Sequence, residues 1–193
     1  MRIFLAGATG VIGVRLLPLL VERGHLVAGM TRSQGKAEAL RALGAEPVVC
    51  DVFDAAALEE AVVAFRPGAV LHELTDLPDD EALTSEFRPA NARIRREGTR
   101  NLLAAARAAG ASRFLAQSVA WEIPGDGGAA VAELERSVLE ADGVVLRYGR
   151  LYGPGTWYEQ TPPTPPRVHV DEAAKRTVEA LSEPSSVITV VDD

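Results

Sequence analysis

The sequence has little cysteine and no long apolar run, and each shortage restricts the class of protein. Cys50 is the only cysteine and lies among apolar residues, so a disulfide framework is excluded and a buried thiol in a reducing compartment is expected. A membrane-spanning helix needs roughly 20 apolar residues, and no run approaches that length. The first strand-like run starts at residue 2, with no signal peptide before it. We therefore expect a cytoplasmic protein without a membrane partner.

Positive charge is also in short supply. The formal net charge is -7, the arginines are scattered, and the only lysines are Lys36 and Lys175. Nucleic acids are held by a basic face, so no nucleic-acid partner is expected, and no metal site is predicted. With 193 residues, of which 47% are hydrophobic, the chain 1–193 is long enough for one domain with a sizeable core.

Three glycines spaced three apart follow a short apolar run at the start of the chain. The run Arg2–Ala6 predicts a buried strand, and Gly7 predicts the tight turn after it. Gly10 would let the backbone approach a pyrophosphate, and Gly13 would let the next helix pack closely on the sheet. The alternative is a glycine turn that binds nothing.

The context of the glycines favours a dinucleotide site. A helix over Val11–Arg23 and a second apolar run, Leu26–Met30, complete a strand–helix–strand unit of about thirty residues. Thr9, Val11 and Ile12 lie between the glycines and are predicted to contact the same ligand. The helix N–H groups would face its phosphates.

The same alternation of strand and helix patterns continues to the end of the chain. Strands are predicted at Arg2–Ala6, Leu26–Met30, Pro47–Val49, Ala69–His72, Arg113–Gln117, Val144–Arg147 and Val187–Val191. Helices are predicted at Val11–Arg23, Gly35–Leu43, Ala55–Phe65, Pro89–Ala109, Ala129–Ala141 and Asp171–Leu181. The fold class is therefore α/β, a Rossmann-type doubly wound parallel sheet with helices on both faces.

Ligands of such sheets collect at the carboxyl ends of the strands, so the residues after the second strand indicate the cofactor. Thr31, Arg32 and Ser33 occur there, followed by Lys36, and no acid lies between Gly24 and Glu38. An acid would accept from a ribose 2′-OH, whereas a 2′-phosphate needs cations and hydroxyl donors. NADP(H) is therefore predicted in preference to NAD(H). Alternatively, Arg32 is only an exposed loop residue.

The ends of the next two strands carry further candidates. Asp51 and Val52 are predicted to lie against the adenine, although Asp51 could equally cap the helix that begins near Asp54. Leu74 and Thr75 would flank the middle of the cofactor.

Three ionisable residues near the fourth strand are not assigned to the site. His72 lies inside an apolar run and is expected to be a core histidine. Glu73 and Asp76 lie near the same rim of the sheet, and the sequence assigns neither a role.

Together these segments resemble the extended and atypical short-chain dehydrogenase/reductase family, in its NAD(P)-dependent epimerase/dehydratase branch. The resemblance rests on Gly7–Gly13, Asp51–Val52, Glu97–Leu103, Gln117–Val119, Leu146–Gly155 and His169–Ala173. It implies that Ser118 is the catalytic hydroxyl that hydrogen-bonds a substrate carbonyl, and that the segment from Tyr148 passes the nicotinamide. It also implies that residues 148–186 form a reduced substrate-binding portion.

The chain departs from that family at the proton donor and in length. The family uses a tyrosine with a lysine four residues later, and the matching positions here are about Gly127 and Val131. The spans 122–128 and 157–168 are also short for the family, which predicts that substrate-facing segments are missing from this sequence.

Two functions follow from these expectations. The first is an NADP-dependent oxidoreductase that acts on a small carbonyl or hydroxyl substrate without the tyrosine–lysine pair. The alternative is a redox sensor that binds NADP(H) without chemistry. In either case a homodimer could pair the helices predicted at Ala55–Phe65 and Pro89–Ala109.

Overall fold

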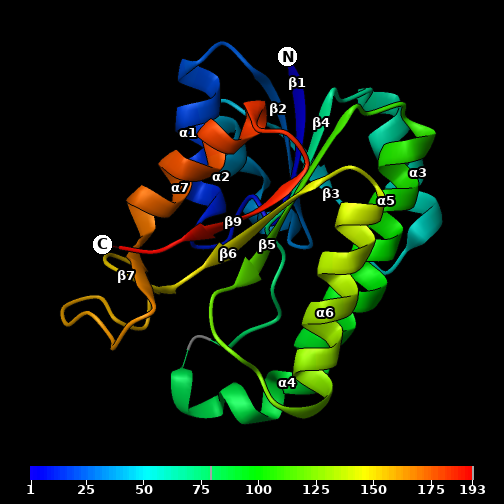
Figure 1. Ribbon diagram of the computed structural model, residues 1–193. Coiled ribbons are helices and arrows are strands. Elements are labelled where there is room, and N and C mark those ends of the chain that lie inside the picture. Colours follow the sequence, from blue (N-terminus) through cyan, green and yellow to red (C-terminus); the bar gives the residue numbers. More distant parts are fainter. Residues whose placement is uncertain (79, 193) are drawn as a thin grey trace.

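The computed structural model describes residues 1–78 and 80–192. Seven strands form one parallel sheet in the order β3-β2-β1-β4-β5-β6-β9 (Figure 1). They are β1 (Arg2–Ala6), β2 (Leu26–Thr31), β3 (Glu46–Val49), β4 (Ala69–His72), β5 (Arg113–Val119), β6 (Val144–Tyr148) and β9 (Ser186–Val190). The predicted Rossmann-type fold class is confirmed.

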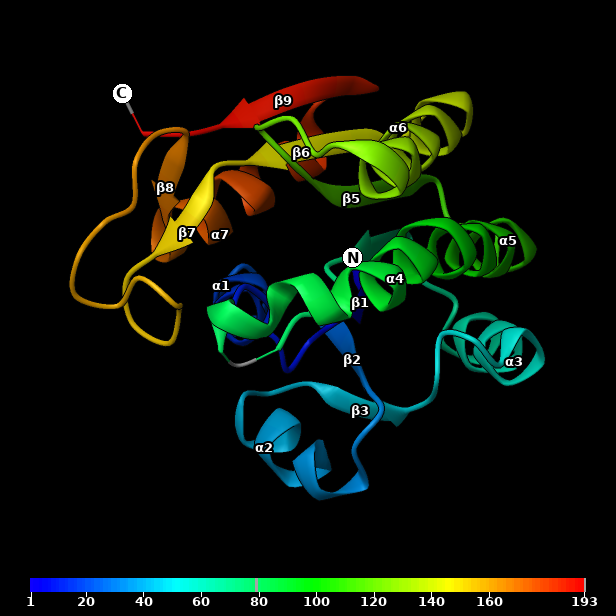
Figure 2. The ribbon, with the colours of Figure 1, turned by 90° about the horizontal axis from the view of Figure 1, so that it is seen from below.

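Helices cover both faces of the sheet. They are α1 (Gly13–Glu22), α2 (Ala37–Ala42), α3 (Ala55–Phe65), α4 (Thr84–Arg93), α5 (Thr99–Ala108), α6 (Gly125–Glu140) and α7 (Val170–Glu179). Figure 2 shows α1, α2 and α7 on one face and α3, α5 and α6 on the other. The helix α4 lies beyond the carboxyl ends of the strands, at the bottom of Figure 1.

Near-continuous apolar runs form the strands because both faces are covered. In β1 the side chains of Ile3 to Ala6 are fully buried, and they alternate between two cores. Ile3 and Leu5 pack toward α1 and α7, whereas Phe4 and Ala6 pack toward α3 and α5. Cys50 is buried in the second core, as expected.

A second, two-stranded parallel sheet was not predicted. It pairs β7 (Arg150–Tyr152) with β8 (Arg167–His169). Each strand has three residues, too short for a strand pattern to show in the sequence. Gly149 permits the pairing, because a Cβ there would lie 2.6 Å from the backbone of Arg167.

Two helix predictions were wrong in their bounds. The predicted helix Pro89–Ala109 begins earlier, as α4, and a π-helical turn at Ile94–Gly98 separates α4 from α5. The helix predicted from Ala129 begins at Gly125, directly after Pro124. Three glycines in its first turn give no helical signal, because glycine disfavours helix interiors. Within the described residues, no helix has both the length and the apolar character needed to cross a bilayer.

Candidate functional site

The glycine loop, residues 7–13, packs closely against the start of α1 and against the segment that follows β4. Gly7 adopts φ +90°, and a Cβ there would lie 2.5 Å from the Glu73 carbonyl oxygen. A Cβ on Gly13 would lie 2.2 Å from the Gly7 carbonyl oxygen. These two positions require glycine because backbone atoms occupy the space of a side chain.

Two backbone donors of this loop are left without acceptors in the described part of the chain. The Gly10 N–H donates to the Gly7 carbonyl at 2.9 Å, and the Val14 N–H donates to the Gly10 carbonyl at 3.1 Å. Among the described residues, none accepts from the N–H groups of Val11 and Ile12. Ile12 is the N-cap of α1 and offers no side-chain cap. The donors and the positive end of the helix dipole fit the pyrophosphate of a dinucleotide.

The end of β2 lies beside this loop. The Thr31 hydroxyl is buried and lies 3.3 Å from the Thr9 hydroxyl, and it accepts from the Ser33 N–H at 3.2 Å. Arg32 is half exposed and pairs loosely with Asp76, at 3.4 Å between Nη2 and Oδ1. Such an exposed pair is worth about 0–1 kcal/mol, so Arg32 is available to a stronger anion.

Lys36 is exposed in a short 3₁₀ turn after β2. It lies four residues after Arg32 in the sequence, and its backbone N–H donates to the Ser33 carbonyl at 3.0 Å. The predicted phosphate contacts of Arg32, Ser33 and Lys36 stay predictions.

The residues after β3 lead into the N-terminus of α3. Asp51 accepts from the Phe53 N–H at 3.0 Å, whereas Asp54 caps α3 by accepting from the Ala57 N–H at 3.1 Å. The alternative that Asp51 caps this helix is therefore wrong. Val52 is buried, and its carbonyl accepts from the Asn101 side chain at 2.9 Å.

After β4, one candidate is tied to the core and another is exposed. The Leu74 carbonyl accepts from Gln117 Nε2 at 2.9 Å, which joins the ends of β4 and β5, and Thr75 is exposed. His72 is fully buried, and its Nε2 lies 3.1 Å from the Thr99 hydroxyl. Burial, together with the charge of Arg95, lowers the pKa of His72 to about 4. The expectation of a neutral core histidine is confirmed.

Glu73 is a buried acid with an unsatisfied oxygen. Its Oε1 accepts from the Tyr148 hydroxyl at 3.3 Å, and among the described residues no donor reaches Oε2. The Tyr148 hydroxyl also lies 2.6 Å from the Thr177 hydroxyl in α7. Burial raises the pKa of Glu73 to about 8, so the carboxyl group is mainly protonated at neutral pH. Tyr148 is buried as well, and its predicted contact with the cofactor stays a prediction.

Ser118 belongs to a charged cluster that the sequence did not predict. Its hydroxyl donates to Glu135 Oε1 at 2.6 Å, and Arg147 donates to the two Glu135 oxygens at 2.8 and 2.5 Å. Burial opposes ionisation of Glu135, but hydrogen bonds from Arg147 and Ser118 outweigh it and hold its pKa below the usual range. The sequence carries one sign of this cluster: the acid Glu135 lies beside Leu134 and Val138, which are apolar, buried positions of α6.

We expect Ser118→Ala to lower the free energy of unfolding by about 1.5 kcal/mol, because a hydrogen bond to a buried carboxylate is lost. Urea unfolding measures this change, and Ser112→Ala, whose hydroxyl meets a carbonyl at the surface, is the control. An unchanged stability would mean that Arg147 alone satisfies Glu135.

The predicted substrate-binding portion, residues 148–186, is fastened to the glycine side of the sheet. Arg15 of α1 pairs with Asp171 of α7 at 2.7 Å and also donates to the Pro154 carbonyl. Trp157 Nε1 donates to the Pro78 carbonyl at 3.1 Å. The loop after β7 is thereby joined to the loop after β4, near the carboxyl ends of the strands.

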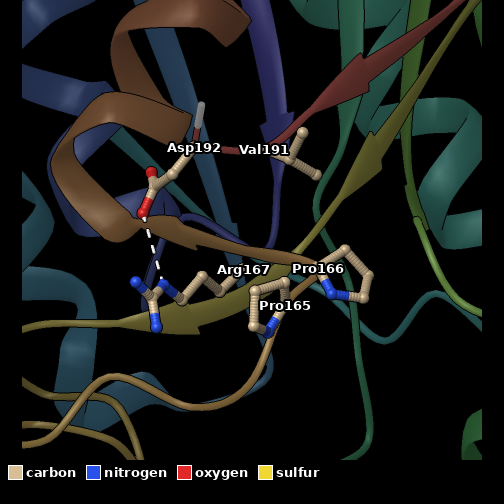
Figure 3. A pocket seen from close by; sticks show the side chains of 5 residues that line it. All are labelled: Pro165, Pro166, Arg167, Val191 and Asp192. Carbon is tan, nitrogen blue, oxygen red and sulfur yellow. Dashed lines mark ion pairs between the residues drawn. The ribbon is translucent and has the colours of Figure 1, made fainter.

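A pocket of about 360 Å³ lies at the carboxyl end of β9, lined by Pro165, Pro166, Arg167, Val191 and Asp192 (Figure 3). Arg167 Nε and Asp192 Oδ2 face each other across it at 3.9 Å. Three of these residues, Pro165 to Arg167, belong to the predicted substrate-binding portion, but none of the predicted cofactor-binding residues lines this pocket. Its two charges balance each other, so we place the functional site at the glycine loop instead.

The fold and the glycine loop define an NAD(P)-binding protein of the oxidoreductase type. The chain belongs to the NAD(P)H-binding family, whose model matches residues 7–151. The predicted resemblance to NAD(P)-binding reductases is thereby confirmed, and the fold is shared with NAD-dependent epimerases of solved structure.

Particular relatives agree with this class. The chain is 40% identical over 237 residues to a 3-diazoavenalumate denitrifying reductase of Streptomyces sp, covering 100% of this chain and 76% of the relative. It is 32% identical over 174 residues to the dTDP-4-dehydrorhamnose reductase of Streptomyces griseus, covering 80% of this chain and 51% of the relative. The fold matches the UDP-glucose 4-epimerase of Thermus thermophilus, in complex with NAD, with TM-score 0.82 and 22% identity over 99% of this chain and 78% of the other.

The alignment with the denitrifying reductase is 237 positions long, 44 more than the 193 residues of this chain. The relative therefore carries at least that many residues at internal positions where this chain has none. The spans 122–128 and 157–168 are where the sequence predicts such residues to be missing.

Proposed function

We propose that the chain is an NADPH-dependent reductase whose substrate is an electron-poor aromatic cation of the arenediazonium class. The observation that carries the proposal is a glycine loop suited to a dinucleotide in a chain whose helix α6 lacks the tyrosine–lysine pair of the family. The helix α6 contains neither tyrosine nor lysine, and the expected positions are held by Gly127 and Val131.

The substrate class follows from proton balance. NADPH, when bound, supplies a hydride. A carbonyl that accepts a hydride becomes an alkoxide and needs an acid nearby. An arenediazonium cation that accepts one forms a C–H bond, breaks its C–N bond and releases dinitrogen with the bonding electron pair. The net reaction consumes no proton, so a site without a tyrosine–lysine pair can support it.

The name of the 40% identical relative supports this substrate class, because it describes a reduction of a diazo compound with loss of nitrogen. The sequence predicts a small carbonyl or hydroxyl substrate, so an assay must compare such a substrate with the diazonium cation. In this scheme the chain binds the dinucleotide through the glycine loop, and the joined loops after β4 and β7 exclude water from the reacting groups.

The test mixes the purified protein with NADPH and 4-methylbenzenediazonium, and follows NADPH absorbance and toluene formation. We expect toluene and NADP⁺ in equal amounts, faster than in a mixture without protein, and no comparable turnover of benzaldehyde. Tight NADPH binding without product above the protein-free rate would contradict the reductase and favour the redox sensor.

Arg32→Ala tests the preference for NADP(H). Charge-assisted hydrogen bonds to a phosphate are worth about 1.5–3 kcal/mol, so the Kd for NADPH should rise about 10- to 100-fold while that for NADH stays nearly constant. Fluorescence titration measures both constants, and Arg41→Ala is the control, since Arg41 pairs with Glu38 on α2. Equal losses for both nucleotides would contradict a 2′-phosphate contact.

A further inference from the structure

Arg95 occupies the π-helical turn between α4 and α5, on the side that faces the end of β4. Asn91, four residues earlier, accepts from the Asp76 N–H at 3.2 Å through its side chain. Thr99, four residues later, hydrogen-bonds His72. Residues four apart share a helix face, so Arg95 lies between two side chains that both contact the segment from His72 to Asp76.

The neighbouring arginines pair with acids, whereas no acid in the described part of the chain pairs with the Arg95 guanidinium. Arg93 pairs with Glu97 at 2.7 Å and stacks on the Phe53 ring at 3.8 Å. Arg96 pairs with Asp126 at 2.7 Å and with Glu133 at 3.2 Å. No described residue forms a hydrogen bond or an ion pair with Arg95, although its side chain is partly buried.

An unpaired cation that has lost water is unfavourable unless an anion reaches it. Desolvation lowers the pKa of Arg95, and its charge in turn lowers the pKa of buried His72. Among the described residues, the fully buried side-chain atoms without a partner do not include the Arg95 nitrogens, so the guanidinium is open to an anion from outside the described protein groups.

An anion bound by Arg95 would be a different group from the phosphates of the dinucleotide, because Arg95 lies at a different place along the sheet. Those phosphates are accounted for by the glycine loop after β1 and by Arg32 after β2. Arg95 lies at the end of β4, next to β5, on the opposite side of β1 from β2. Neighbouring strands are about 4.8 Å apart, so the ends of β2 and β4 are separated by roughly 10 Å.

We infer that Arg95 binds a carboxylate of the substrate and so selects anionic aromatic substrates. This inference rests on the proposed reductase function and extends it to a substrate class. The planar guanidinium can donate two parallel hydrogen bonds to a carboxylate, which fixes both the position and the orientation of the attached ring. Arg95 thus acts as a specificity-determining residue at the end of β4.

The experiment measures equilibrium binding to the NADP⁺-saturated protein, with cinnamate and its neutral amide, cinnamamide, as probes. We expect the wild type to bind cinnamate at least about tenfold more tightly than cinnamamide. Arg95→Gln should bring the two constants within about twofold, and Arg95→Lys should give an intermediate ratio because it keeps the charge but loses the planar fork.

Arg100→Gln is the matched control, because Arg100 is an exposed arginine at the start of α5. It should keep the wild-type preference, and all variants should bind NADP⁺ equally. If Arg95→Gln fails to fold, Arg95→Lys carries the test. A cinnamate affinity unchanged in the Arg95 variants, or a loss of NADP⁺ affinity in them, would overturn the inference.

The binding readout separates this inference from the proposed function. An Arg95-dependent preference for cinnamate without diazonium turnover would reject the reaction and retain the anion site. Diazonium turnover with no effect of Arg95 on carboxylate binding would retain the reaction and reject the anion site.

Discussion

Glu73→Gln should raise the free energy of unfolding by about 3 kcal/mol at pH 7. The pKa of Glu73 is raised to about 8 in the folded protein by burial, from the model-peptide value of 4.5. Between these two values the unfolded chain has released a proton that the folded chain keeps. The contribution of Glu73 to stability therefore falls by about 1.4 kcal/mol for each pH unit from 4.5 to 8, whereas that of His72, whose pKa is lowered to about 4, rises with pH up to about 6.5. Glutamine carries no such penalty, and its carbonyl still accepts from Tyr148.

Urea unfolding at pH 5, 7 and 8 measures this effect. The difference in stability between the variant and the wild type should be below about 1 kcal/mol at pH 5 and should reach several kcal/mol at pH 8, because His72 contributes the same pH dependence to both proteins. Glu60→Gln, on the exposed side of α3, should leave the wild-type pH dependence intact. A wild-type slope that persists in Glu73→Gln would show that another group titrates.

The protonated state of Glu73 also suits the glycine loop in front of it. The backbone carbonyl of Glu73 is the atom that excludes a side chain at Gly7, so this residue adjoins the turn that is predicted to bind the phosphates. An ionised carboxylate there would oppose the charge of a pyrophosphate. Burial keeps it neutral instead, and outweighs the hydrogen bond from Tyr148, which lowers the pKa of Glu73.

The sheet and the cofactor loop could be predicted from the sequence because their signals are local. A buried strand of a parallel sheet is an apolar run, as in Arg2–Ala6, and the spacing of Gly7, Gly10 and Gly13 describes one turn and one helix start. The strand positions needed only small changes, such as the extension of β5 to Val119.

The rest of the site depends on partners distant in the sequence. Glu73 meets Tyr148 across 75 residues, and Trp157 meets Pro78 across 79. No spacing rule connects such positions. Arg95 illustrates the same limit, because the feature that distinguishes it from Arg93 and Arg96 is the lack of a described partner, which only coordinates reveal.

The variants Gly13→Ala and Gly10→Ala should distinguish two reasons for glycine in this loop: close packing of α1 at Gly13, and space for the pyrophosphate at Gly10. A Cβ on Gly13 would lie 2.2 Å from the Gly7 carbonyl and 2.8 Å from Ala8 backbone atoms. Backbone cannot rotate aside as a side chain can, so α1 must move away from the loop. We expect Gly13→Ala to lower the free energy of unfolding by about 3 kcal/mol and to abolish NADPH binding.

Gly10→Ala should act on the ligand alone. A Cβ there meets only the Gly7 carbonyl, at 3.3 Å, and Gly10 is exposed on the side where a pyrophosphate would lie. We expect a loss of stability below about 1 kcal/mol and at least a 100-fold weaker NADPH affinity, because the added methyl group occupies ligand space. Gly24→Ala, at φ +77° with open space around it, is the control for backbone strain without contact to the loop. If Gly10→Ala binds NADPH as the wild type does, the pyrophosphate does not approach this face, and the cofactor site proposed here is wrong.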